Sequence, residues 1–106
     1  MAELEHGSEV EARSGQSIVL KGTLGVAQAH QLYREWSSIP ARRVPVVWDA
    51  GGVRRVDTAV VQLLAVFCRT LRAENLSWRW AAAAPVLREA AHLLGLETEL
   101  GLETWP

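Results

Sequence analysis

Twelve residues, from Trp48 to Ala59, hold the side chains of this chain that could do the most definite chemistry. An aspartate follows an apolar segment, a glycine pair and an arginine pair come next, and Asp57-Thr58 opens an apolar-periodic stretch. A helix beginning at Thr58 would present the hydroxyl at its positive end, where backbone N–H groups lack helical partners. A phosphate there would add a charge of about −1.5 to −2. Thr58 is therefore a candidate switch, a partner contact, or a plain first-turn residue after an Asp57 N-cap.

The other polar residues indicate binding more than catalysis. Asp49 has no second carboxylate nearby in sequence except Asp57, which favours a turn-stabilising role over metal binding. Arg54 and Arg55 could meet an acidic partner or a phosphate, or be solvated in a loop. The histidines lack metal-ligand spacing, no phosphate loop is present, and Cys68 falls in mid-helix as a small boundary hydrophobe. We expect no catalytic residue, metal or cofactor, and so no enzyme.

Composition is that of a small soluble domain. A chain of 106 residues can bury a core of its own, and its 49% hydrophobic and 22% charged residues are ordinary. A net charge of −1 provides no overall electrostatic attraction to nucleic acid or to an anionic membrane. One cysteine allows no internal disulfide, and the N-terminal residues lack the pattern of a signal peptide. We expect a cytoplasmic protein that neither binds nucleic acid nor inserts into a membrane.

Apolar alternation and short β-branched runs predict four strands. Three of them are at 17–24, 44–48 and 76–82. The fourth is a short edge strand at 10–12; the alternative is that the polar segment 1–15 frays and forms no strand. Pro45 indicates a bulge or an edge position for the third strand, and a Gly-rich turn through Gly51 is expected to end it.

Apolar spacings of three and four predict helices after each of the last three strands. The first carries an apolar stripe of Val26, Ala29, Tyr33 and Trp36 and ends before Pro40; the third begins at Pro85 and closes at Gly95, before a last turn over 96–102. In the helix from Thr58, the predicted core stripe is Val60, Leu63, Leu64, Phe67 and Leu71. The predicted exposed side is Thr58, Gln62, Ala65, Arg69 and Arg72, with Val61 and Cys68 on the boundary.

Strands separated by helices pair in parallel through right-handed crossovers. We therefore expect one α/β domain over 16–103, with a four-stranded, mostly parallel (mixed) sheet and a C-terminal tail at 104–106. The alternation within two of the strands indicates that the helices cover one face and leave the other open to water.

This layout resembles the STAS domain, a family named for sulfate transporters and anti-sigma factor antagonists. The resemblance spans about residues 17–102 and is carried by Leu20-Lys21-Gly22, Val47-Trp48-Asp49, Val56-Asp57-Thr58-Ala59 with Leu63-Leu64, and Leu94-Gly95-Leu96.

The resemblance implies a bacterial regulatory protein that binds other proteins, with Thr58 at the position that a partner kinase phosphorylates. In an anti-sigma factor antagonist, the unphosphorylated form binds the anti-sigma factor, a serine/threonine kinase-type protein. Val60 stands where the sporulation-type motif Asp-Ser-Ala-Gly has glycine. That departure is compatible with two other branches: the STAS subunit of a bacterial phospholipid ABC transporter, which binds the ATPase subunit, and chemotaxis-linked STAS proteins.

The expected partner surface combines the loop and the start of the helix. It comprises Asp49, Gly51, Arg54, Arg55, Asp57, Thr58, Val61, Gln62 and Ala65. The oligomeric state stays open.

Overall fold

Three parallel strands form the sheet of the computed structural model, which describes residues 15–103. The strands are β1 (Gln16–Leu24), β2 (Val46–Val56) and β3 (Trp78–Ala83), in the spatial order β1-β2-β3. The expected parallel α/β architecture is confirmed, but with three described strands in place of four. The predicted edge strand at 10–12 and the tail at 104–106 lie outside the described residues.

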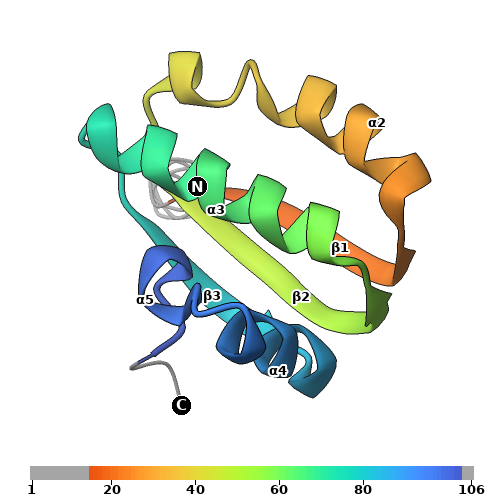
Figure 1. Ribbon diagram of the computed structural model, residues 1–106. Helices are drawn as coiled ribbons and strands as arrows, with labels where there is room; N and C mark the ends of the chain where they lie inside the picture. Colours follow the sequence, from red (N-terminus) through yellow and green to blue (C-terminus); the bar gives the residue numbers. More distant parts are fainter. Residues whose placement is uncertain (1–14, 104–106) are drawn as a thin grey trace, which may run out of the picture.

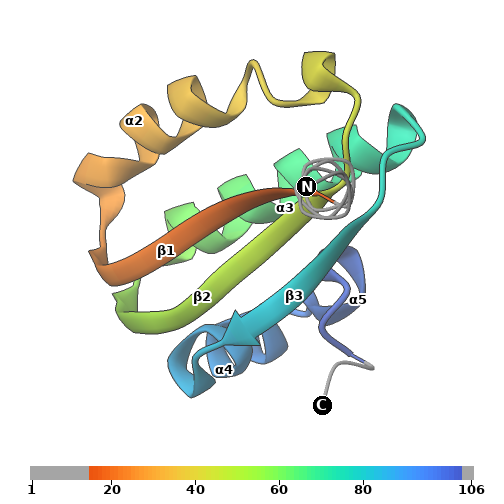
Figure 2. The same cartoon turned by 180° about the vertical axis from the view of Figure 1, so that it is seen from behind.

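The helices lie on one side of this sheet (Figure 1). They are α2 (Val26–Trp36), α3 (Thr58–Ala73), α4 (Pro85–Leu93) and the short α5 (Glu97–Leu100), with a 3-10 turn η1 (Pro40–Arg42) after α2. Seen from behind, the strands stand in front of α3 (Figure 2). On that rear face, Val19, Lys21 and Arg79 are exposed, as the alternation predicts for a sheet with one open face.

The central strand β2 is longer than the sequence predicts. The prediction of a strand that ends at Trp48 and a Gly-rich turn is wrong, because β2 stays paired with β1 as far as Val56. The β1–β2 register shifts at two points, and these β-bulges let the strand continue through the segment that contains the glycines. Pro45 precedes β2, and its carbonyl oxygen accepts the Gln16 N–H at 2.7 Å. Since β2 lies between two neighbours, the predicted edge position is also wrong.

Trp48 lies at the centre of the core and is fully buried. Its ring centroid lies 5.3 Å from that of Trp36 on α2, 5.8 Å from Phe67 on α3 and 5.7 Å from Trp80 on β3. Aromatic pairs at such separations, in edge-on or stacked arrangements, stabilise a core beyond the area they bury. One side chain of β2 thus joins both crossover helices and a neighbouring strand.

Helix α2 buries a narrower line of residues than predicted. Val26 and Tyr33 are 65% and 57% exposed, so their assignment to the apolar stripe is wrong. The predicted Ala29 and Trp36 do contact the core, and Leu32, which was not predicted, joins them. The predicted turn after Gly95 is confirmed as α5.

Candidate functional site

The candidate residues divide between the end of β2 and the start of α3. In a parallel sheet each strand runs toward the same edge, and the helix after it starts there, so this edge collects helix N-termini. Thr58 is the first residue of α3 and is exposed, and Gln62, one turn later, is also exposed. The hydroxyl of Thr58 is thus presented to solvent at the start of a helix of 16 residues.

Asp57 precedes α3 but does not cap it with its side chain. Its carboxylate Oδ2 accepts the backbone N–H of Val26, the first residue of α2, at 3.0 Å. Its own N–H donates to the Leu24 carbonyl oxygen at 2.9 Å, and its carbonyl oxygen accepts the N–H of Val60 at 3.0 Å. Asp57 is the N-cap residue of α3, as expected, but its side chain makes no capping hydrogen bond to α3, because the end of β1 brings the start of α2 within reach of this carboxylate. Asp57 ties the starts of two helices together.

Arg54 and Arg55 lie near the C-terminal end of β2 and are exposed. The β1–β2 register places Arg55 beside Thr23 and Gly52 beside Lys21, so a third exposed cation lies on the neighbouring strand. Among residues 15–103, none of these three side chains forms an ion pair. Within the described residues they form a cationic surface without ionic partners, at the end of the β1–β2 pair that precedes α3.

Asp49 and Gly51 lie within β2, away from the start of α3. Asp49 pairs with Val19 on one side and Ala82 on the other, in the middle of the sheet. The strand from Asp49 to Val56 spans about 20 Å at roughly 3.3 Å per residue. The predicted turn-stabilising role of Asp49 is therefore wrong, and the structure does not bring this carboxylate to Thr58.

Val61 and Ala65 are buried, with exposed fractions of 0% and 2%. The prediction that Ala65 lies on the exposed side of α3 is wrong, and Val61 belongs to the core and not to the boundary. The physical reason is that α3 packs against α2, α4 and α5 as well as the sheet, so its buried arc is wider than one stripe. Leu63, predicted to be core, is half-buried, and Val66 is 51% exposed.

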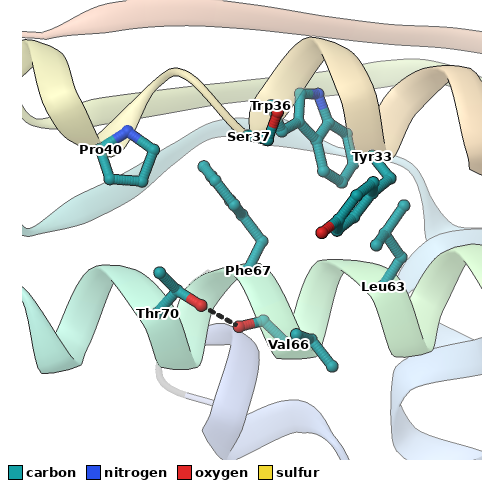
Figure 3. A pocket seen from close by; sticks show the side chains of 8 residues that line it. All are labelled: Tyr33, Trp36, Ser37, Pro40, Leu63, Val66, Phe67 and Thr70. Carbon is teal, nitrogen blue, oxygen red and sulfur yellow. Dashed lines mark hydrogen bonds between the residues drawn. The ribbon is translucent and has the colours of Figure 1, made fainter.

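A groove between α2 and α3 is a hollow that the sequence did not predict. Its volume is about 190 Å³, and Figure 3 shows its lining: Tyr33, Trp36, Ser37, Pro40, Leu63, Val66, Phe67 and Thr70. The Thr70 hydroxyl donates to the Val66 carbonyl oxygen at 3.1 Å, so it is engaged within α3. The sequence pattern predicts Leu63 to be core and assigns Val66 to neither side of the helix, so the apolar pair Leu63 and Val66 was the signal available for this groove.

The C-terminal half of α3 has a structural role. Arg69 and Arg72 are exposed, as predicted, and both also bind Glu99 of α5, at 2.9 and 3.4 Å. The hydrogen bond from Arg69 is the main reason that the pKa of Glu99 is lowered. Burial raises the pKa of the Cys68 thiol to about 12, which keeps it protonated and unreactive.

The described residues hold neither a metal-ligand cluster nor a helix that could span a membrane. Over residues 15–103 no group of three or more His, Cys, Asp or Glu side chains could hold a metal ion. No helix in the same part of the chain is long and apolar enough to cross a membrane. The candidate site consists of the exposed start of α3 and the basic residues at the end of β2.

A protein-family model described as "Mlab, STAS domain" matches residues 9–103. The match covers most of the chain, so this chain belongs to the STAS domain family, and the resemblance inferred from its motifs is confirmed. STAS domains are generally non-enzymatic regulatory or interaction domains that mediate contacts between proteins. No curated protein matches the chain.

Proposed function

We propose that this chain is a non-enzymatic regulator of the anti-sigma factor antagonist type, acting in the bacterial cytoplasm. It binds a partner protein, a serine/threonine kinase-type anti-sigma factor, through the start of α3, and Thr58 is the residue that the partner phosphorylates. The observation that carries this proposal is the exposed hydroxyl at the first position of α3, beside an Asp57 whose carboxylate is held by Val26.

Phosphorylation at this position would change binding without requiring a change of fold. A phosphate at the first residue of a helix is stabilised by the free N–H groups and the positive helix end. The same phosphate would place about two negative charges within the contact with the partner protein. A partner surface that fits the unmodified threonine has no cation or hydrogen-bond donor placed to pair with those charges. The partner would therefore be released while α3 stays folded.

The proposed contact surface differs from the sequence-based one in four residues. Thr58, Gln62, Arg54 and Arg55 supply exposed side chains, whereas Val61 and Ala65 contribute only by supporting the helix from below. Asp57 contributes by fixing where α3 begins relative to α2. Asp49 and Gly51 lie within β2, away from the start of α3, and are not part of this surface.

Mass spectrometry of the protein purified under native conditions from its own cells is the decisive experiment. We expect a phosphate on Thr58 in part of the population and a co-purifying kinase-type ATPase. In pull-downs, Thr58→Glu should lose the partner and Thr58→Ala should retain it in a form that cannot be released. If both variants bind and release the partner like the wild type, Thr58 is not a switch.

A second candidate is the accessory STAS subunit of a phospholipid ABC transporter. Val60 favours it, because this residue is fully buried in α3 at the position where the sporulation-type motif has glycine. Thr58 would then contact the ATPase subunit permanently. The same mass spectra separate the two candidates, since a transporter ATPase bound at constant stoichiometry with unmodified Thr58 supports the second and contradicts the first.

A further inference from the structure

Three exposed cations gather where β1 and β2 end, and we call Lys21, Arg54 and Arg55 the basic patch. Lys21 pairs with Gly52 and Thr23 pairs with Arg55, so the three side chains occupy adjoining strands within three register positions. A Cβ added at Gly52 would lie 3.2 Å from Cβ of Lys21, which shows how closely the two strands approach there. The patch therefore acts as one local concentration of positive charge.

Nothing among the described residues neutralises the basic patch. The nearest acidic side chain along β2 is Asp57, and its carboxylate accepts the Val26 N–H at 3.0 Å. Some other arginines do have acidic partners: Arg43 binds Glu74 at 3.0 Å, and Arg69 binds Glu99 at 2.9 Å. The charge at the basic patch is thus left for a group outside this part of the chain.

Three cations are too few to bind a nucleic acid by charge alone. Proteins that bind DNA electrostatically commonly neutralise about 6–10 phosphates. The basic patch is also bounded by Asp49 and Asp57, and the chain as a whole carries a net charge of −1. A few fixed cations beside a protein-binding helix instead match a small set of carboxylates on a protein surface, since complementary charges steer association and fix the docking register.

We propose that the partner of the α3 surface presents an acidic cluster to the basic patch. This inference rests on the proposed function, because it names the chemistry of the partner at that same surface. It also gives the switch a physical cause. A phosphate on Thr58, three residues after Arg55, cancels most of the positive charge that attracts the carboxylates of the partner and repels those carboxylates directly.

Lys21 offers a direct test because it is the only lysine in the chain. A carbodiimide joins a lysine amine to a carboxylate as an amide with loss of water, and it adds no spacer. In the complex isolated from native cells, we expect a cross-linked peptide that joins Lys21 to an Asp or Glu of the partner. Lys21→Arg should keep the complex and lose this cross-link, because arginine keeps the charge but supplies no reactive amine.

Charge reversal tests the energetic part of the proposal. Arg54→Glu/Arg55→Glu should weaken binding to the co-purified partner by roughly tenfold or more at low salt, and by less at high salt. Arg34→Glu/Arg42→Glu is the matched control, since it makes the same change of net charge at two exposed positions of α2 and η1. It should bind the partner like the wild type, and thermal melts should show that both doubles are folded.

The outcomes separate this inference from the proposed function. If Thr58→Glu releases the partner while the patch double binds normally and Lys21 forms no cross-link, the acidic partner surface is wrong and the switch stands. If the wild type retains no partner, the proposed function is contradicted and this inference falls with it. The third outcome is that Arg54→Glu/Arg55→Glu still binds the partner protein but no longer co-sediments with phosphatidylserine vesicles. In that case the basic patch binds lipid and the proposal is overturned.

Discussion

Thr58 and Phe67 lie on the same helix and have opposite relations to the fold. Thr58 is exposed at the first position of α3, and no side-chain hydrogen bond from it is found within the described residues. Phe67 is 7% exposed and packs against Trp36 and Trp48, with ring centroids 5.6 and 5.8 Å away. One side chain is available for contact, and the other holds two helices and a strand together.

Two substitutions should therefore separate recognition from folding. Thr58→Ala should lower the free energy of unfolding by about 1 kcal/mol or less, the cost of losing a first-turn side chain. Phe67→Ala should lower it by about 3–5 kcal/mol, through lost burial and the cavity that remains. Denaturant unfolding followed by circular dichroism measures both values. Equal losses would mean that Thr58 is structural, which would contradict its assignment to the contact surface.

At the scale of elements, the four-residue helix α5 is held by side chains from other parts of the chain. The carbonyl oxygen of Leu100 accepts the indole N–H of Trp78 at 2.8 Å and that of Trp80 at 2.7 Å. The guanidinium of Arg72 also lies over the Trp78 ring, 5.1 Å from its centroid. A helix this short is unstable alone, so these contacts decide its position.

Gly101 ends α5 in the left-handed conformation and provides a test of this anchoring. A Cβ at Gly101 would lie 3.0 Å from Nε1 of Trp78, whereas a Cβ at Gly95 would meet nothing within 4 Å. Both glycines have positive φ, of 76° and 70°, so alanine at either should cost about 1–2 kcal/mol of backbone strain. Gly101→Ala should cost about 0.5–1.5 kcal/mol more, because it disturbs the Trp78 hydrogen bond.

Chemical denaturation of the two glycine variants gives this difference directly. The matched backbone conformations remove the common strain from the comparison, and near-ultraviolet circular dichroism reports the tryptophan environment. A Gly101→Ala variant no less stable than Gly95→Ala would show that Trp78 moves aside without cost, and that its bond to Leu100 does not hold α5.

At the scale of the whole molecule, two exposed ion pairs make stability depend on pH. His92 Nδ1 lies 2.9 Å from Glu97 Oε1, and this hydrogen bond raises the pKa of His92 above its ordinary 6.5. Its stabilisation is fully present below pH 6.5 and is lost as the pH rises through the folded-state pKa. The pKa of Glu99 is lowered from 4.5, so its stabilisation is present above pH 4.5 and is lost as the pH falls through the folded-state pKa.

Both contributions coexist between pH 4.5 and 6.5, so they favour a stability maximum on the acidic side of neutrality. Because the pairs are solvent-exposed, we expect a small effect on the thermal midpoint. His92→Gln should flatten the decline in midpoint above pH 6.5, and Glu99→Gln should flatten the decline below pH 4.5. Thermal melts across this range are the measurement, and an unchanged profile in both variants would show that other groups set the pH dependence.

The local pattern of apolar residues in the sequence was sufficient to predict the class of fold and the position of Thr58 at the start of a helix. The alternation that buries Leu20 and Leu24 specifies which face of β1 is covered, and a helix after each strand requires parallel pairing. The start of α3 at Thr58 follows from the change of apolar period at Asp57. These features depend on backbone geometry and nearby residues, which a sequence contains directly.

Tertiary structure decided which side chains remain available to a partner. Ala65 and Val61 are buried because several elements enclose α3, and the periodicity of one helix cannot reveal how many neighbours it has. Asp57 binds Val26, 31 residues earlier, because β1 and β2 end side by side. The same pairing extends β2 through its glycines and places Lys21 beside Gly52. Contacts between residues distant in sequence form only when the sheet assembles, so the contact surface and its charge emerge at that level.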